Sequence, residues 1–276
     1  MKKSKGLLFM LKLLFPLTEC RITRHGIYIN KKLQARLTKK VAEGPLYFPY
    51  DLDFSKNGFE AIWEKAITGI KASPKFLEMT VSDYWLRYFV FTPPNTASSL
   101  DDMRGFASMR FETLFNQASE DWVLRSDWST TGSSLVCAIP RHLIDQIQAS
   151  TKMRRQCITS LQPNFIKEWN KWKNTIKDGT WFAVCESTGL VVAVAQFGSI
   201  VNLLSVPYGA EKNGQWLINQ LIRFSVLARS ALPEQLEIVG EVPTHWNLKK
   251  IMTNQLGDKY SLSLVNTAMN DHKSQQ

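Results

Sequence analysis

Hydrophobic and polar positions along the chain follow two different periods, and the changes between them predict a mixed α/β protein. Strand-like runs begin near Arg21. A helical run follows from Phe59 to Ile70, where apolar residues recur at spacings of three and four. The segment WFAVCESTGLVVAVAQFGSIVNLLSV, residues 181–206, is apolar apart from two short polar interruptions, so it predicts three strands joined by tight turns. A helix over 214–229 and a strand over 236–243 are expected next.

The middle of the chain predicts further strands and helices. The β-rich run KFLEMTVSDYWLRYFVFTPP is expected to turn near Ser82 and Asp83. The next helix is expected to be capped by Ser98 or Ser99, because two acidic residues follow in its first turn. Further elements are predicted as a hairpin over 121–140, a helix that Pro140 opens in its first turn, a strand over 157–163 and a helix over 164–177.

The order of these elements repeats along the chain. The first part reads β-β-β-α-β, with its third strand predicted over 33–42, and the part from about Gly179 reads β-β-β-α-β again. The letters hardly repeat, so the repetition is one of element order and predicts two related α/β halves with a cleft between them. The expected divisions are a basic amphipathic segment at 1–20, a first half at 21–177, a shortened second half at 178–262 and a disordered tail at 263–276.

Six segments, taken in order, resemble a group of bacterial proteins. They are TVSDYWLRYFVFTPP, MRGFASMRFETLFN, DWVLRSD, LVCAIPRHLID, ITSLQPNFIKEWNKWK and WFAVCESTGLVVAVAQFGSI. The series resembles the cytoplasmic actin-like proteins of pilus and secretion machines: PilM of type IV pili, the MshI-like proteins and the cytoplasmic part of GspL of type II secretion. The resemblance covers roughly residues 21 to 243. It implies the actin-like ATPase fold, of the ribonuclease-H-like kind, with duplicated halves of which the second is reduced.

This resemblance implies a non-enzymatic scaffold at the cytoplasmic face of the bacterial inner membrane. Proteins of the group bind the cytoplasmic tail of a bitopic partner of the PilN type, and they help connect the platform to an assembly ATPase. We therefore expect a peripheral protein of type IV pilus biogenesis or type II secretion. A groove in the first half is expected to take an extended partner peptide, for example by adding a strand to a sheet edge.

Two hairpin turns are the candidate phosphate-binding sites, because actin-like ATPases hold ATP between two such turns, each commonly with an Asp-x-Gly core. The glycine lets backbone N–H groups approach phosphate, and the aspartate holds Mg²⁺ through water. Here the first turn ends at Gly26 and lacks the acid, while the second carries Glu186, Ser187, Thr188 and Gly189. We expect structural hairpins and no cofactor. The alternatives are ATP binding without hydrolysis, as PilM-like members can show, and an ATPase or phosphotransferase that uses Glu186 with Mg²⁺.

The charge of the chain favours an anionic neighbour, with simple solubility as the alternative, since the net charge is +10 and the pI is about 9.4. The N-terminal sequence MKKSKGLLFMLKLLFPLTEC joins a basic start to an apolar run shorter than the roughly 20 residues that span a bilayer. We expect a cationic amphipathic segment on the inner leaflet, with Lys2, Lys3, Lys5 and Lys12 facing the anionic membrane. A helix packed on the domain, a frayed end and a signal peptide are the alternatives. No nucleic acid is expected as a partner, and a nuclease is disfavoured because the sequence shows no cluster of acids for its metal; a basic nucleic-acid-binding module is the alternative.

Cysteine and histidine positions argue against metal and disulfide chemistry. No CxxC and no Cys/His cluster is present, so zinc is not expected. Cys137 and Cys185 lie in apolar runs and are predicted to be buried, reduced thiols, as in the cytosol. Asp83 is interpreted as a turn residue that bonds its own backbone, with a catalytic carboxylate as the alternative. Three tryptophans are candidate anchors for a partner peptide, namely Trp122, Trp128 and Trp246.

Overall fold

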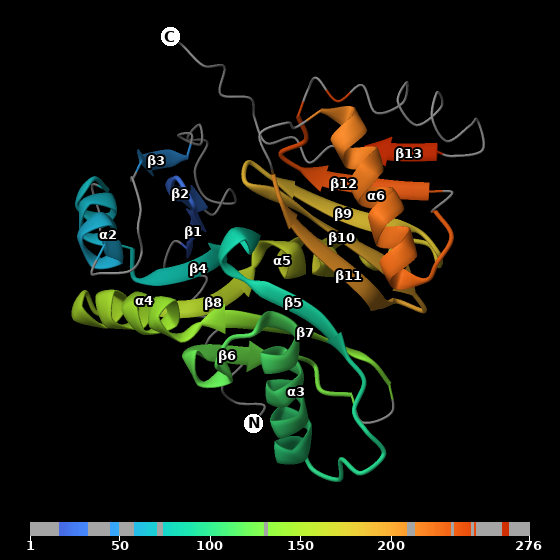
Figure 1. Cartoon of the computed structure of the whole chain (residues 1–276). Coiled ribbons are helices and arrows are strands. Elements are labelled where there is room, and N and C mark those ends of the chain that lie inside the picture. Colours follow the sequence, from blue (N-terminus) through green and yellow to red (C-terminus); the bar gives the residue numbers. More distant parts are fainter. Residues whose placement is uncertain are drawn as a thin grey trace. The chain divides into compact units, whose positions relative to one another are not determined.

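The computed structural model describes residues 17–32, 45–49, 58–70, 74–129, 132–208, 213–232, 235–243, 246 and 261–264 (Figure 1). These residues divide into two compact units. Unit 1 comprises the described residues up to Leu86, with Glu120–Val123 and Ile139–Lys167; unit 2 comprises Arg87–Ser119, Leu124–Ala138 and the described residues from Glu168 onward. The four segments predicted from the sequence follow the repeated element order and do not correspond to these units. Their boundaries stay a prediction.

Unit 1 contains a five-stranded sheet with the order β3-β2-β1-β4-β8. Strand β1 (Leu17–Thr23) pairs antiparallel with β2 (Gly26–Lys32), and β2 pairs antiparallel with β3 (Leu46–Pro49). On its other side β1 pairs parallel with β4 (Phe76–Val81), which pairs parallel with β8 (Cys157–Pro163). The parallel strands need crossover helices, and the chain supplies one before β4 and another before β8.

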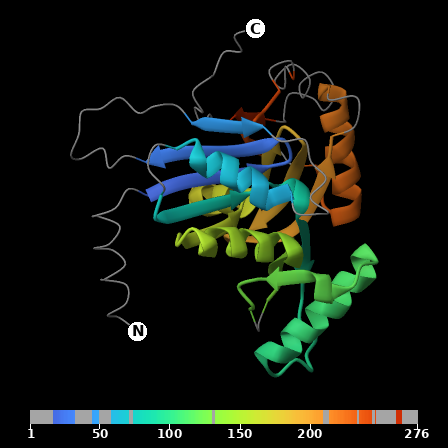
Figure 2. The same cartoon turned by 90° about the vertical axis from the view of Figure 1, so that its left-hand side faces the viewer.

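Helices α2 (Gly58–Thr68) and α4 (Arg141–Met153) are these crossovers, and they pack against each other. Figure 2 shows both in front of the strands of unit 1. Phe59, Trp63 and Ile67 of α2 are buried, and their spacing of four places them on one side of the helix. The helical period predicted for this segment is therefore confirmed.

Unit 2 contains a second five-stranded sheet with the order β11-β10-β9-β12-β13. Strands β9 (Trp181–Glu186), β10 (Gly189–Gln196) and β11 (Ser199–Pro207) form an antiparallel meander. Strand β12 (Gln235–Gly240) runs parallel to β9, and β13 (Ser261–Leu264) runs parallel to β12. When the strands of each five-stranded sheet are numbered along the chain, both sheets have the spatial order third, second, first, fourth, fifth. The predicted duplication is therefore confirmed.

One face of this second sheet is covered by α6 (Gly214–Ala228). Leu217, Leu221 and Phe224 of the helix are buried against the sheet, at helical spacings of three and four. The ring centroids of Phe224 and Trp181 lie 4.9 Å apart, edge to face. This apolar layer fixes β9 and its turn, which carries Glu186.

Between β4 and α4 the chain adds a small subdomain, which unit 2 largely contains. It consists of β5 (Arg87–Phe91), α3 (Leu100–Phe115), β6 (Trp122–Arg125) and β7 (Ser134–Pro140), with the sheet order β5-β7-β6. Strand β5 lies alongside β11 of unit 2. Helix α5 (Asn164–Trp172) follows β8 and runs from unit 1 into unit 2.

The start of α3 confirms the predicted cap. Ser99 is the N-cap, and its hydroxyl accepts the N–H of Asp102 at 3.0 Å. The carboxylate of Asp102 in turn accepts the N–H groups of Ser98 and Ser99, each at 3.0 Å. These hydrogen bonds hold the pKa of Asp102 below its ordinary value, and the bond from the Ser98 backbone has the largest effect.

Of two predicted boundaries, one is confirmed and one is wrong. The run through Ser82 and Asp83 turns where predicted: a short 3₁₀ helix, Asp83–Trp85, follows β4, and β5 then joins another sheet. The Ser82 hydroxyl accepts the N–H of Tyr84 at 3.3 Å and so favours that turn of helix. Pro140 is the N-cap of α4 and not its first helical residue, because its ψ of 127° is extended.

Three further elements differ from expectation. The third strand of unit 1 is β3, whereas the strand predicted over 33–42 lies outside the described residues. Strand β13 was not expected at all, since four residues at 261–264 carry too little pattern to indicate a strand. Helix α5 ends at Trp172, short of the predicted end at 177.

Within the described part of the chain, no helix is both long and apolar enough to cross a membrane.

Candidate functional site

The first predicted turn joins β1 to β2 and is closed by its own side chains. The Thr23 hydroxyl donates to the Gly26 carbonyl at 2.8 Å, and the Gly26 N–H donates back to the Thr23 oxygen at 3.2 Å. The Tyr47 hydroxyl donates to the His25 carbonyl at 2.8 Å. The Gly26 N–H is the kind of group that would approach a phosphate, and here it is used within the turn.

Gly26 has a packing reason to be glycine. A Cβ at this position would lie 2.2 Å from the ring of Tyr47 and 2.8 Å from the carbonyl oxygen of Phe48. Among the described residues, the glycines with positive φ do not include Gly26, so its backbone does not demand glycine. The close approach of β3 accounts for this residue without a ligand.

The second predicted turn brings its four residues together at one hairpin tip. Glu186 ends β9 and pairs with Gly189 at the start of β10, which leaves Ser187 and Thr188 as the loop. Glu186 and Thr188 are buried, and Ser187 is exposed. The N–H of Tyr208 donates to the Thr188 carbonyl at 3.0 Å, which ties the turn to the end of β11.

A carboxylate that the sequence analysis missed lies on this turn. The N–H of Ser187 donates to Oε2 of Glu241 at 2.9 Å, and the N–H of Glu241 donates to the Cys185 carbonyl at 2.9 Å. Glu241 directly follows β12, so the parallel pairing of β12 with β9 places it here. An anion from the chain itself thus occupies a backbone N–H of the candidate phosphate turn.

Two glycines allow the strands around this turn to approach closely. Gly240 has a φ of +94°, and a Cβ there would lie 2.3 Å from the carbonyl oxygen of Cys185. A Cβ at Gly189 would lie 2.7 Å from the carbonyl oxygen of Val206 in β11. Gly240 therefore permits the position of Glu241, and Gly189 has a packing role beside the one predicted from the sequence.

A buried thiol and a phenol lie beside the same turn. Burial raises the pKa of Cys185 to about 12; a hydrogen bond from Tyr208 opposes this shift, and the charge of Glu241 adds to it. Burial also raises the pKa of Tyr208, and Cys185, Glu241 and Glu186 add to that shift. Both Glu186 and Glu241 act on the phenol of Tyr208, so the electrostatic potential beside the turn is negative. This potential disfavours a phosphate that arrives without a cation.

The raised pKa of Cys185 predicts a loss of stability at alkaline pH. An unfolded thiol loses its proton near pH 8.5, whereas the folded thiol keeps it up to about pH 12, so raising the pH above about 8.5 favours unfolding. We expect the free energy of unfolding, measured with urea, to fall between pH 9 and 11, and to fall less steeply in Cys185→Ala. Equal slopes in both proteins would contradict the shift. As a control, iodoacetamide at pH 8 should modify exposed Cys157 and spare Cys185.

Asp83 bonds to the start of a helix, a use that the sequence analysis did not predict. It is buried, and its Oδ1 accepts the N–H of Phe165 at 3.0 Å, in the first turn of α5. In the same helix Lys167 forms an ion pair with Glu19 of β1, and its Nζ lies 3.3 Å from the hydroxyl of Thr80. These polar contacts fix the start of α5 within unit 1.

The remaining predicted residues divide between confirmed, corrected and undescribed positions. Cys137 and Cys185 are buried thiols, as predicted. Trp246 is only 2% exposed and packs with Tyr208 and Trp216, so it belongs to the core and is no surface anchor. Among the described residues, no group of three or more metal-ligating side chains could hold a metal ion. The membrane-facing candidates lie outside the described residues: Lys2, Lys3, Lys5 and Lys12.

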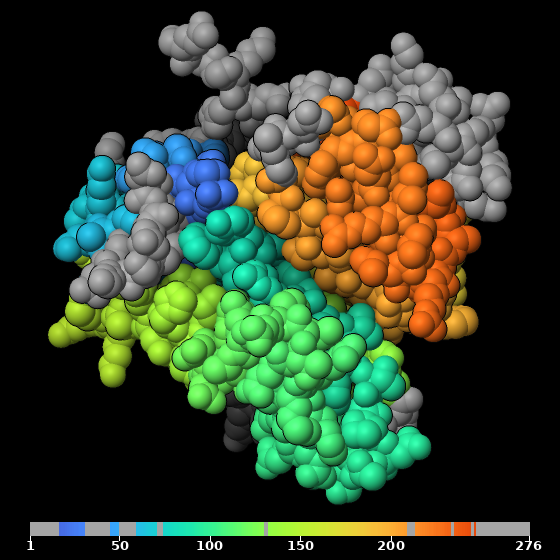
Figure 3. Space-filling view, in the orientation of Figure 1, coloured from blue at the N-terminus to red at the C-terminus, as the bar shows by residue number. Residues whose placement is uncertain are grey.

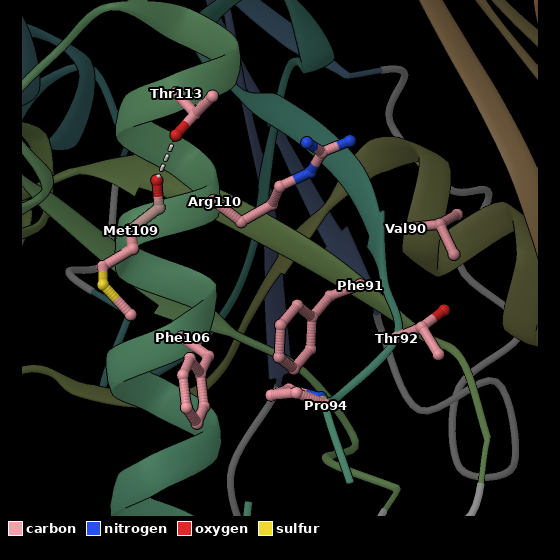
Figure 4. Close-up of a pocket in the computed structure, with 8 residues that line it drawn as sticks. All are labelled: Val90, Phe91, Thr92, Pro94, Phe106, Met109, Arg110 and Thr113. Carbon is pink, nitrogen blue, oxygen red and sulfur yellow. Dashed lines mark hydrogen bonds between the residues drawn. The ribbon is translucent and has the colours of Figure 1, made fainter. Parts of the chain in front are cut away.

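A groove between α3 and β5 is a second candidate site (Figure 4). Its volume is about 460 Å³, and its wall residues are Val90, Phe91, Thr92, Pro94, Phe106, Met109, Arg110 and Thr113. Phe91 is buried, Phe106 is half-buried and Met109 is 54% exposed. The side chain of Arg110 extends from α3 toward β5 in Figure 4. The groove therefore offers polar and apolar surface in similar measure, with one cation at its side, which suits a peptide that carries apolar and acidic side chains.

The two sheets share one strand order, and structural comparison places this order in a known fold. The PilM–PilN type IV pilus biogenesis complex matches with a TM-score of 0.65 at 10% identity, over 91% of this chain and 88% of that chain. This chain has the actin-like ATPase fold. A Bacteroides thetaiotaomicron protein of that fold, of unknown function, matches with a TM-score of 0.59 at 8% identity, over 90% of each chain.

A further match is the cytoplasmic domain of EpsL, an inner-membrane component of the type II secretion system of Vibrio cholerae. Its TM-score is 0.55 at 11% identity, over 91% of this chain and 86% of that chain. No protein-family model matches the sequence, and no curated protein matches it. The predicted actin-like fold is thus confirmed by structure alone, because identities this low carry no more than the fold.

Proposed function

We propose that this actin-like chain is a non-enzymatic scaffold on the cytoplasmic face of the bacterial inner membrane, in a platform for type IV pilus biogenesis or type II secretion. It binds the cytoplasmic tail of a bitopic partner of the PilN type. The observation that carries the proposal is the bond between Ser187 and Glu241, because it fills the anion-binding position of the second turn from within the chain. The similarity in fold to PilM and to the EpsL cytoplasmic domain supports the choice of machine.

The bond matters because a phosphate would have to displace an internal ligand. The N–H of Glu241 holds its backbone to β9, so its carboxylate stays close to Ser187. As part of the same chain it has a high effective concentration there, which a free phosphate lacks. The first turn offers no substitute, since Thr23 uses the N–H of Gly26. A phosphotransferase that relied on Glu186 would need both hydrogen bonds to break, the one from Ser187 to Glu241 and the one from Gly26 to Thr23. We therefore propose a scaffold in preference to an enzyme.

The groove between α3 and β5 is the proposed site for the partner tail. Its apolar wall residues Phe106 and Met109 can take hydrophobic side chains, and Arg110 can pair with an acidic residue of the tail. The exposure of Met109 leaves apolar surface open in the chain alone, which a bound tail would cover.

A photo-crosslinking amino acid at position 109 tests this proposal in cells. We expect it to capture a single-span inner-membrane protein with a short cytoplasmic segment, through that segment, identified by mass spectrometry. The matched control is position 114, because Leu114 is 44% exposed on the same helix but does not line the groove. Capture of soluble proteins alone, or equal capture from both positions, would contradict the proposal.

A further inference from the structure

An aromatic side chain is exposed to solvent on a two-residue turn at one end of unit 2. Phe197 lies between β10 and β11 and is 89% exposed. Both loop residues have positive φ, 51° for Phe197 and 71° for Gly198, as in a type I′ hairpin turn. Asparagine or aspartate is favoured at the first of these positions, and a bulky residue there is strained. The N–H of Phe197 donates to Oδ1 of Asp178 at 2.7 Å, which stabilises the turn.

The end of α6 exposes further apolar side chains at the same end of the unit. Ile222 is 42% exposed, Val226 71% and Leu227 62%, although the opposite side of the helix already packs on the sheet. The amide of Asn202 in β11 donates to the carbonyl of Ala228 at 3.5 Å, so the C-terminus of α6 lies beside the start of β11. Figures 1 and 3 show α6 on the outside of unit 2, with much of its outer surface open.

Positive charge surrounds these side chains. Arg223 and Arg229 are exposed on and directly after α6, and Lys177 is exposed in the segment before β9. No acidic residue occurs between positions 213 and 232. Among the described residues, the acids at this end are Asp178, which is bonded to the Phe197 turn, and Glu237, which is half-buried and interacts with Lys177.

We infer that this end of unit 2 docks on the surface of an anionic lipid bilayer. The docking patch, here called the Phe197 patch, consists of Phe197, Ile222, Val226 and Leu227 with Arg223, Arg229 and Lys177. The inference rests on the proposed location at the membrane face, and it names the surface that makes the contact.

The chemistry of the patch favours lipid over a protein partner. A protruding aromatic residue suits the interfacial region of a bilayer, where rings lie at the level of the headgroups. A helix side with exposed aliphatic residues and arginines, and no acids, suits the interface plane, where the apolar groups enter and the cations meet anionic headgroups. The net charge of +10 draws the whole chain toward such a surface.

Vesicle flotation with the full chain tests the inference. The probe is vesicles of phosphatidylglycerol and phosphatidylethanolamine, with phosphatidylcholine vesicles as the neutral comparison. We expect binding to the anionic vesicles only. Phe197→Ser, and Val226→Ser combined with Leu227→Ser, should each lower the partition coefficient at least about tenfold. Arg223→Gln and Arg229→Gln should each lower it about fivefold. Leu114→Ser is the control and should leave it unchanged, since Leu114 is 44% exposed on α3 and lies in neither the groove nor the Phe197 patch.

Three results would overturn the inference. The first is a wild-type chain that does not bind anionic vesicles. The second is binding that survives the Phe197 patch variants and disappears when Lys2, Lys3, Lys5 and Lys12 are all changed to glutamine. The third is patch variants that keep vesicle binding but lose a protein partner. Crosslinking from position 109 is independent of these readouts, so failure of tail capture with vesicle binding retained would reject the partner and not the membrane contact.

Discussion

Replacement of Gly240 by alanine should lower the free energy of unfolding by about 2 to 5 kcal/mol, the sum of two penalties. The backbone of Gly240 has a φ of +94°, a conformation that costs any other L-residue energy. The added Cβ would also lie 2.3 Å from the carbonyl oxygen of Cys185, so β12 would have to move away from β9. Urea denaturation measures the loss, and the displaced strand would carry Glu241 away from Ser187.

Gly179 provides the matched control for this substitution. Its φ of +80° imposes a similar backbone penalty, but a Cβ there would meet nothing within 4 Å. Gly179→Ala should therefore cost only about 1 to 2 kcal/mol. If the two variants lost equal stability, the close contact between Gly240 and Cys185 would be wrong, and with it the placement of Glu241 on the turn.

Replacement of Met109 by aspartate should raise the Kd for the captured tail by about 100-fold or more. The bound tail would bury a new carboxylate against apolar side chains, and this carboxylate would compete with the acidic residue of the tail for Arg110. The fold should tolerate the change, because Met109 is 54% exposed in the chain alone. Fluorescence anisotropy with a labelled tail peptide measures the affinity.

Leu114→Asp is the matched control for the groove variant. It adds the same charge to an exposed position of α3 that does not line the groove, so its Kd should stay within about twofold of the wild type. If Met109→Asp bound the tail as tightly as Leu114→Asp, the tail would bind elsewhere on the chain and not in the groove.

The repeated element order could be predicted because it depends on local patterns. The apolar run at 181–206, broken by two tight turns, indicates three strands, and these strands are β9, β10 and β11. Helices α2 and α6 carry clear helical periods, and Ser99 with Asp102 marks the start of α3. Strands β3 and β13 have four residues each, so each depends on neighbouring strands for its stability and leaves little trace in the sequence.

The candidate site could be predicted only as far as it is local. The four residues of the second turn are consecutive, so the sequence places them together. Glu241 reaches Ser187 from 54 positions away, and only the parallel pairing of β12 with β9 brings it there. The use of Asp83 by α5 depends likewise on a contact 82 positions apart. Contacts of this length follow from the sheet order, which one sequence does not reveal.

A thermal-unfolding scan with and without millimolar MgATP, run on the wild type and on Glu186→Ala, tests the central claim most directly. A ligand that binds only the folded state, at about 100 times its Kd, adds about 2.7 kcal/mol and raises the unfolding midpoint by a few degrees. With Glu241 on the turn, we predict no shift in either protein. A shift of several degrees in the wild type that is lost in Glu186→Ala would show that the turn holds nucleotide, and it would contradict the scaffold proposed for this chain.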